Sequence, residues 1–201
     1  LRTCLWGHAV ADQLRVVLAE DNYLVREGTR RLLEDSGEVD VVAAVGNADE
    51  LLDAVRRFAP QAVLTDIRMP PGHHMEGIEA AHAIRHEHPG IGVVVLSQHT
   101  DETYAFALLS DGTAGLAYLL KDRLGDLDEL IRALHEVTRG GSVIDPVVVA
   151  EDDGPLQAVA QLADVARPVV GAQALSSGVV QAHGPLAQLR RQMLQIPVEQ
   201  R

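Results

Sequence analysis

The chain has 201 residues, 47% of them hydrophobic and 23% charged, and a net charge of −12. These values are ordinary for a globular protein, and the single cysteine, Cys4, excludes a disulfide framework. The first 150 residues carry 24 acidic and 13 basic side chains, which argues against nonspecific binding to nucleic acid. No apolar run approaches the roughly 20 residues that span a bilayer, and the opening segment does not resemble a signal peptide, so we expect a cytoplasmic protein without membrane contact.

From residue 14 onward, short apolar runs alternate with segments of helical periodicity. The apolar runs predict strands at 14–19, 39–45, 61–66, 91–97 and 113–120. The periodic segments predict helices at 20–37, 48–60, 75–90 and 101–112, and a fifth helix that Asp126 caps. In the first helix, Leu24, Gly28 and Leu32 recur four residues apart. Five strands alternating with five helices predict an α/β fold, with a parallel sheet covered by helices on both faces.

Polar side chains stand where four of these strands end. Glu20 and Asp21 follow the first strand, and Asp66 ends the third. Ser97 ends the fourth strand, and Lys121 follows the fifth. Ligands of open parallel sheets bind at the carboxyl ends of the strands, so we expect these groups to share one crevice. Three carboxylates so close together repel one another unless a cation lies among them, and Mg²⁺, which prefers oxygen ligands, meets that requirement.

Lys121 is the only lysine in the chain, whereas arginine occurs sixteen times. A lysine ammonium is a compact charge on a flexible stem, which suits contact with one oxygen of a phosphoryl group. Asp66 would then be the nucleophile that forms an aspartyl phosphate, and Ser97 could donate a hydrogen bond to it. Taken singly, such residues are more often helix caps, loop hydroxyls or solvated charges. Their coincidence at the strand ends favours the functional interpretation.

Four segments, LAEDN, LTDIRMPPG, VVVLSQ and AYLLKD, resemble the motifs of the receiver domain of bacterial two-component response regulators. They occur in the family's order within residues 14–146. The resemblance implies a doubly wound, flavodoxin-like fold with five parallel strands in the order 2-1-3-4-5. It also implies a signalling protein that takes a phosphoryl group from a sensor histidine kinase, with Mg²⁺ as cofactor, rather than a conventional enzyme.

The resemblance implies a role for each residue that matches a motif. Asp66 matches the phosphoacceptor. Asp21 matches a direct Mg²⁺ ligand, Glu20 matches the acid that contacts the ion through water, and the backbone carbonyl of Arg68 matches a further ligand. Lys121 matches the lysine that binds the phosphoryl group.

The resemblance also implies how the phosphate would change the protein. Ser97 matches the hydroxyl of the conformational switch, and Tyr118 matches its aromatic partner. The side chains of Arg68 and His99 match the positions that tune the lifetime of the phosphate. The fourth helix, fifth strand and fifth helix match a common face for homodimers.

The segments DGTAGLAYLLKD and RGGSVIDP resemble most closely the regulators that carry a LuxR-type helix-turn-helix after the receiver. The chain departs from that pattern near Ala150, since glutamine occurs eight times in the last 51 residues and only three times before. One segment, SSGVVQAH, is similar to the start of a recognition helix, but Gly184 and Pro185 follow at once and would break it. We expect a tail that does not bind DNA specifically, and an altered reading frame would account for it.

The expected regions are an extension at 1–13, a receiver domain at 14–146 and a partly helical or disordered tail at 147–201.

Two other functions fit parts of the pattern. A Mg²⁺-dependent phosphohydrolase of the haloacid dehalogenase type also uses an aspartyl nucleophile, but it needs a second aspartate where this chain has Arg68. A flavin mononucleotide carrier needs a first loop rich in Gly, Ser and Thr, whereas this loop begins with Glu20 and Asp21.

His82 and His86, one helical turn apart, have a spacing compatible with zinc. No cysteine or suitably placed acid completes a zinc site, so we expect these histidines to face solvent.

Overall fold

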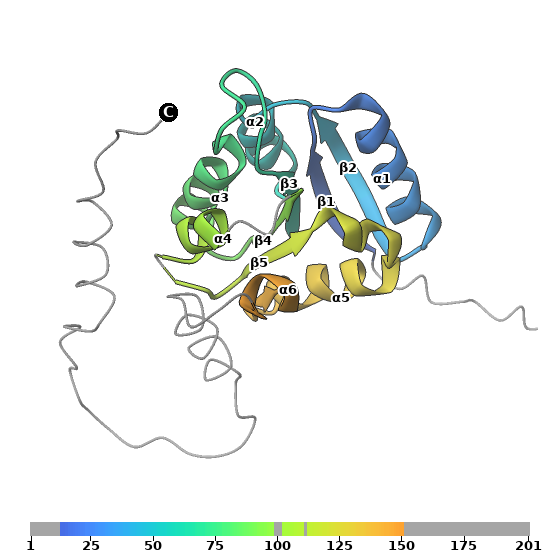
Figure 1. Cartoon of the computed structure of the whole chain (residues 1–201). Helices are drawn as coiled ribbons and strands as arrows, with labels where there is room; N and C mark the ends of the chain where they lie inside the picture. Colours follow the sequence, from blue (N-terminus) through green and yellow to red (C-terminus); the bar gives the residue numbers. More distant parts are fainter. Residues whose placement is uncertain (1–12, 99–101, 111, 151–201) are drawn as a thin grey trace, which may run out of the picture. The chain divides into compact units, whose positions relative to one another are not determined.

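The computed structural model describes residues 13–98, 102–110 and 112–150 (Figure 1). Expectations about His99, the extension before residue 13 and the tail beyond residue 150 lie outside these residues. The strands are β1 (Leu14–Ala19), β2 (Val39–Val45), β3 (Ala62–Asp66), β4 (Gly92–Ser97), β5 (Leu116–Leu120) and β6 (Val143–Ile144). The helices are α1 (Tyr23–Asp35), α2 (Ala48–Phe58), α3 (Glu76–Glu87), α4 (Glu102–Leu109), η1 (Lys121–Gly125, a 3-10 helix), α5 (Leu127–Thr138) and α6 (Pro146–Ala150). Each helix in this described part of the chain is too short or too polar to cross a membrane.

The strands form one parallel sheet in the order β2-β1-β3-β4-β5-β6. This confirms the predicted α/β fold and the predicted order of its first five strands. The short β6 was not predicted; it pairs with the outer edge of β5, opposite Ala117 and Tyr118. Because Asp66 lies opposite Leu96, and Ser97 opposite Leu120, the carboxyl ends of β3, β4 and β5 are level with one another.

Helices cover both faces of the sheet, so the strands alternate between two apolar cores (Figure 1). One core joins the sheet to α2, α3, α4 and α6, and the other joins it to α1 and α5. In β4, for example, Val93 and Val95 face the first core, whereas Val94 and Leu96 face the second. Burial on both sides is why the strand sequences are nearly all apolar instead of alternating with polar residues.

The first helix begins three residues later than its sequence pattern predicted. The Asn22 side chain caps it by accepting hydrogen bonds from the backbone N–H groups of Leu24 and Val25, at 3.0 and 3.3 Å. Glu20 and Asp21 therefore lie in the loop between β1 and α1, at the end of the sheet. The predicted cap of α5 is confirmed, because the Asp126 side chain accepts a hydrogen bond from Glu129.

The 3-10 turn that follows β5 is tied to the last described segment of the chain. The guanidinium of Arg123 donates two hydrogen bonds to the buried Asp145 carboxylate, at 2.9 and 3.0 Å. Asp145 also accepts from the backbone N–H groups of Leu120 and Val147. Burial alone would raise the pKa of Asp145, but the Arg123 guanidinium and these N–H donors outweigh it and hold the pKa below its ordinary value. The backbone that carries Lys121 is thus fixed to the junction of β6 and α6.

Gly77 lets α3 begin directly against the end of β3. Its backbone N–H donates to the carbonyl of Ile67, and a Cβ atom at residue 77 would lie 1.8 Å from the backbone oxygen of Asp66. Real atoms cannot approach so closely, so any larger residue must push the helix and strand apart. Gly28, on the surface of α1, has no atom within 4 Å of such a Cβ. The two glycines therefore form a matched pair for a test of close packing.

We expect Gly77→Ala to lower the free energy of unfolding by about 3 kcal/mol, because the added methyl group overpacks the backbone behind Asp66. Gly28→Ala should instead raise it by about 0.5–1 kcal/mol, because alanine is the better helix former at an open position. Urea denaturation followed by circular dichroism measures both. Equal effects of the two substitutions would show that α3 does not rest on Asp66 in the way described.

Candidate functional site

Three carboxylates meet at the carboxyl end of the sheet. Glu20, Asp21 and Asp66 each offer an oxygen, and these oxygens lie within 4.8 Å of one another. Glu20 and Asp66 are buried, at 2% and 7% exposure, and the side chain of Asp21 is 30% exposed. Arg26 of α1 fixes the loop that carries two of them, because its guanidinium donates to the backbone carbonyls of Glu20 and Asp21 at 2.5 and 3.4 Å. The fold therefore confirms the proximity that the strand ends predicted.

The Lys121 ammonium lies between two of the carboxylates. Its Nζ atom is 2.7 Å from Oε2 of Glu20 and 2.9 Å from Oδ2 of Asp66, and its side chain is 11% exposed. The remaining oxygens are also paired: Glu20 Oε1 accepts from the backbone of Asn22, and Asp66 Oδ1 accepts from that of Ile67. This buried network satisfies both acids, and the single lysine of the chain supplies its positive charge.

Burial and charge act against each other in this network. Burial raises the pKa of Glu20, and the nearby Asp66 carboxylate raises it further, so the hydrogen bond and charge of Lys121 offset this only in part. Burial would lower the pKa of Lys121, but its hydrogen bonds to Glu20 and Asp66 outweigh that effect and raise the pKa above its ordinary value. Lys121 is therefore held as a cation, whereas the charged form of Glu20 is disfavoured relative to its form in water.

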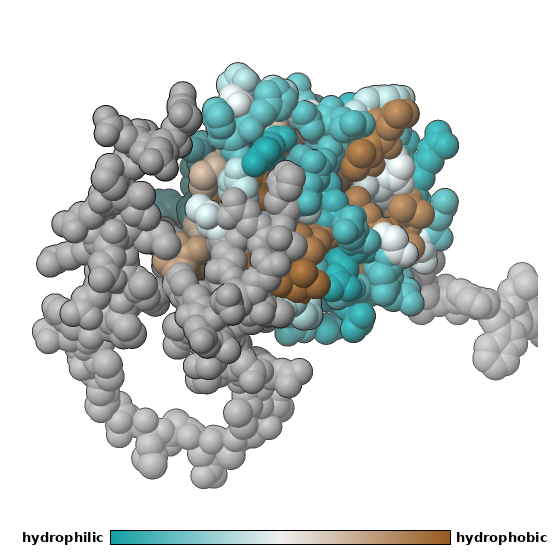
Figure 2. All heavy atoms as spheres, in the orientation of Figure 1, coloured by the Kyte–Doolittle hydropathy of each residue, from teal (hydrophilic) through white to brown (hydrophobic). Residues whose placement is uncertain are grey.

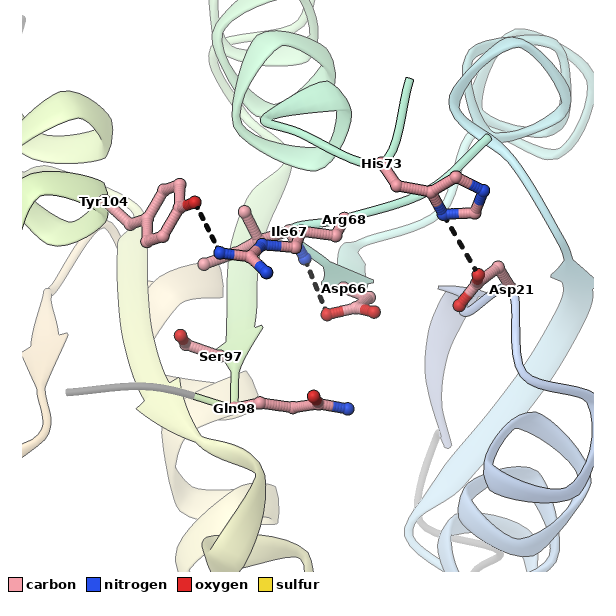
Figure 3. Close-up of a pocket in the computed structure, with 8 residues that line it drawn as sticks. All are labelled: Asp21, Asp66, Ile67, Arg68, His73, Ser97, Gln98 and Tyr104. Atoms are coloured by element: carbon pink, nitrogen blue, oxygen red, sulfur yellow. Dashed lines mark hydrogen bonds and ion pairs between the residues drawn. The ribbon is translucent and has the colours of Figure 1, made fainter. Parts of the chain in front are cut away.

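A polar pocket of about 240 Å³ opens beside this network (Figure 3). It is lined by Asp21, Asp66, Ile67, Arg68, His73, Ser97, Gln98 and Tyr104. Arg68 donates from Nη2 to the Tyr104 hydroxyl at 2.7 Å, and Nδ1 of His73 lies 3.5 Å from Oδ2 of Asp21. The pocket therefore carries acidic groups at its floor and a guanidinium and an imidazole on its walls.

Three polar residues of the lining, Gln98, His73 and Tyr104, were not assigned to the site from the sequence. Gln98 follows the recognised Ser97 directly, so its place at the strand end was a usable signal. His73 lies in the loop after β3 and has a left-handed backbone, φ 57°. No sequence pattern predicted this conformation. Tyr104 is in α4, and its approach to the pocket depends on how that helix packs on the sheet.

The donor atoms of the acidic cluster fit a hard divalent cation. Mg²⁺ takes oxygen ligands, and three converging carboxylates supply both the oxygens and the negative charge that such an ion requires. Within the described residues, this is the only group of three or more His, Cys, Asp or Glu side chains close enough to hold a metal. The histidine pair on α3 is not part of such a group, and Nε2 of His82 lies 3.1 Å from the carbonyl of Leu108.

The two residues expected to form a conformational switch are both buried. Ser97 ends β4 at 2% exposure, on the wall of the pocket. Tyr118 lies in β5, is fully buried and belongs to the core under α3 and α4. Its strand partner is Val95, two residues before Ser97. The two residues of the expected switch therefore lie on adjacent strands, Ser97 in the pocket and Tyr118 in the core.

We expect Lys121→Ala to raise the pKa of Glu20 further, because the substitution removes the one charge and hydrogen bond that Lys121 gives to this buried acid. A ¹³C NMR titration of protein labelled at the glutamate carboxyl carbons measures it. Arg56→Ala is the control, since that cation pairs with Asp53 on the exposed surface of α2 and should leave Glu20 unchanged. An unchanged or lower pKa of Glu20 in Lys121→Ala would contradict the described network.

Several known proteins with similar sequences are named transcriptional regulators. The chain is 36% identical over 137 residues to the transcriptional regulatory protein DegU of Brevibacillus brevis, which covers 68% of this chain and 55% of DegU. It is 31% identical over 162 residues to the probable transcriptional regulatory protein NarL of Mycobacterium tuberculosis, covering 81% of this chain and 70% of NarL. The matched part spans 55%, 60% and 61% of DegU and of two Bacillus subtilis regulators, LnrK and YxjL.

Solved structures show the same fold. The signal receiver domain of the putative response regulator NarL from Mycobacterium tuberculosis superposes with a TM-score of 0.57 at 30% identity, covering 65% of this chain and 99% of that one. A LuxR-family two-component response regulator from Aurantimonas gives a TM-score of 0.58 at 26% identity, covering 75% and 98%. The model of the response regulator receiver domain matches residues 16–135. The chain therefore belongs to the response regulator receiver family.

Proposed function

We propose that Asp66 accepts a phosphoryl group from a sensor histidine kinase in the cytoplasm and that this modification switches the conformation of the domain. The observation that carries the proposal is the buried pairing of Lys121 with both Glu20 and Asp66. A cation held at a carboxylate beside an open polar pocket is the arrangement that phosphoryl transfer to that carboxylate needs.

In the transfer, a carboxylate oxygen of Asp66 forms a bond to phosphorus while the bond from phosphorus to a nitrogen of the kinase's phosphohistidine breaks. The electron pair of that bond stays on the imidazole nitrogen. Asp66 faces the pocket from the end of β3, where Ile67 orients one of its oxygens by a 2.8 Å hydrogen bond. The fixed orientation reduces the entropy that the reaction would otherwise lose.

Glu20, Asp21 and Asp66, with the backbone carbonyl of Arg68, would hold Mg²⁺ at this site. When bound, the ion would offset the negative charge that gathers where a phosphoryl group meets three carboxylates. Glu20 and Asp21 are held in place by the loop that Asn22 and Arg26 fix.

Lys121 would exchange its partners when Asp66 is phosphorylated. Its ammonium now pairs with Oδ2 of Asp66, and the flexible stem lets it follow the added negative charge onto a phosphoryl oxygen. Ser97, on the pocket wall, would donate to another phosphoryl oxygen. Tyr118, in the adjacent strand, would then repack toward the space that the Ser97 loop leaves, which shifts a two-state equilibrium.

The surface of α1 offers a contact area for the kinase beside the pocket. Leu24 is 78% exposed and Leu32 is 45% exposed, so the repeat that predicted the helix leaves these apolar side chains in solvent. Figure 2 shows brown, apolar side chains over this part of the molecule. Apolar side chains gathered on one helix next to a reactive group are typical of a protein-binding surface.

A homodimer through α4, β5 and α5 stays a prediction for the output of the switch. Two features of the chain restrict this face: β6 occupies the outer edge of β5, and α6 packs against α4 with Val148 fully buried. One RcsB structure contains dimers bound to DNA, at 24% identity to this chain. We do not propose specific DNA binding, because the one tail segment that is similar to a recognition helix is followed at once by Gly184 and Pro185.

We expect acetyl phosphate with Mg²⁺ to phosphorylate the protein on Asp66, giving a shifted band on a phosphate-affinity gel. Asp66→Asn should abolish the band, because its amide is a poor nucleophile, and a chelator should abolish it by removing the metal. Asp53→Asn, on the exposed surface of α2, is the matched control and should leave the band unchanged. A band that persists in Asp66→Asn would place the phosphoryl group on another residue.

A further inference from the structure

A contact between Arg68 and Tyr104 spans the mouth of the pocket. Nη2 of Arg68 donates to the Tyr104 hydroxyl at 2.7 Å, and the guanidinium carbon lies 5.4 Å from the centre of the ring. Both side chains line the pocket that holds Asp66 and Ser97. Figure 3 shows the guanidinium between Tyr104 and Asp66, with the phenol approaching from the side of α4.

The two partners differ in how firmly the fold holds them. Tyr104 stands in the first turn of α4, a helix that Ala105 and Leu108 anchor in the core without exposure. Arg68 is an exposed residue in the loop after β3, and its guanidinium lies at the end of a long, flexible side chain. Among the described residues, no carboxylate forms an ion pair with Arg68. The hydroxyl of Tyr104 is therefore the group that fixes the guanidinium above the pocket.

We propose that Tyr104 is a positioning residue that holds Arg68 across the pocket mouth and thereby lengthens the lifetime of the phosphoryl group on Asp66. The inference rests on the proposed function of Asp66. The guanidinium has five N–H donors in a planar fork, and the Tyr104 hydroxyl accepts a hydrogen bond from only one of its nitrogen atoms, Nη2. The others are left for the phosphoryl oxygens, and the group's bulk restricts the approach of water.

The reaction that this arrangement slows is hydrolysis of the aspartyl phosphate. The oxygen of a water molecule forms a bond to phosphorus, and the bond from phosphorus to the Asp66 oxygen breaks. The electron pair of that bond restores the Asp66 carboxylate, and both protons of the water leave with inorganic phosphate as H₂PO₄⁻. Water must reach phosphorus on the side opposite Asp66, which is the open mouth of the pocket where Arg68 and Tyr104 meet.

The test compares the half-life of the phosphorylated protein in four variants and the wild type. Each protein is loaded with radiolabelled acetyl phosphate and Mg²⁺, freed of donor by desalting, and followed by the loss of protein-bound label. The variants are Tyr104→Phe, Arg68→Ala, the double variant and Tyr23→Phe. Tyr23 is the matched control, because it also carries an exposed phenol near an arginine, Arg26, but lies outside the pocket.

Tyr104→Phe should shorten the half-life by about two- to tenfold, the effect of losing one hydrogen bond of ordinary strength. Arg68→Ala should shorten it at least as much, and adding Tyr104→Phe to Arg68→Ala should have no further effect, because the phenol acts only through the guanidinium. A structural role of Tyr104 would instead lower stability in both backgrounds. Tyr23→Phe should match the wild type.

Three outcomes would overturn the inference. The first is an unchanged half-life in Tyr104→Phe with normal loading. The second is a longer half-life, which would mean that the phenol keeps Arg68 away from the phosphoryl group. The third is additive effects of the two substitutions. If the wild type takes up no label at all, the proposed function of Asp66 fails together with the inference, and this result is distinct from the other three.

Discussion

The structure depends on one arrangement of charge, a lysine ammonium buried between two carboxylates at the end of a parallel sheet. Lys121 lies within 3 Å of both Glu20 and Asp66, and all three side chains are largely removed from water. Burying an ion costs several kcal/mol unless partners replace its hydration. Lys121 therefore gives both buried carboxylates a partner of opposite charge. Breaking the network at Lys121 would leave Glu20 in an environment that favours its neutral form.

Several parts of the fold serve to hold this arrangement. The register of β3, β4 and β5 brings the ends of the strands level, so that Asp66, Ser97 and Lys121 reach the same pocket. Gly77 allows α3 to begin against the backbone of Asp66. The pairing of Arg123 with Asp145 fixes the turn that starts at Lys121. That last contact also connects the site physically to β6 and α6, the segment that leads toward the rest of the chain.

Much of this could be predicted from the sequence because it depends on short-range patterns and on one topological rule. Apolar runs mark the buried strands, and the carboxyl ends of such strands meet at one edge, so the meeting of Glu20, Asp66 and Lys121 followed from their positions alone. The order of the five main strands came from the resemblance of the motifs. The start of α1 was missed by three residues, since Asn22 caps the helix in place of the acids before it.

Other features depend on how helices pack, which the sequence does not encode locally. The four-residue repeat of Leu24, Gly28 and Leu32 predicted a helix correctly. The two leucine side chains nevertheless face solvent, whereas Thr29 is buried. A repeat indicates a face of a helix but not the direction that this face takes. Tyr104 and His73 reach the pocket through the placement of α4 and a left-handed turn, and neither belongs to a recognisable motif.

The central claim is that the Lys121 ammonium pairs with the Asp66 carboxylate before phosphorylation and moves to an oxygen of the phosphoryl group afterwards. A crystal structure with Mg²⁺ and beryllofluoride, a mimic of the phosphoryl group, tests it most directly. The account predicts beryllium bonded to an Asp66 carboxylate oxygen, with the Lys121 ammonium in contact with a fluorine atom and no longer with Oδ2 of Asp66. A structure in which the mimic occupies Asp66 while Lys121 keeps its present contacts, or in which the mimic binds elsewhere, would contradict the account.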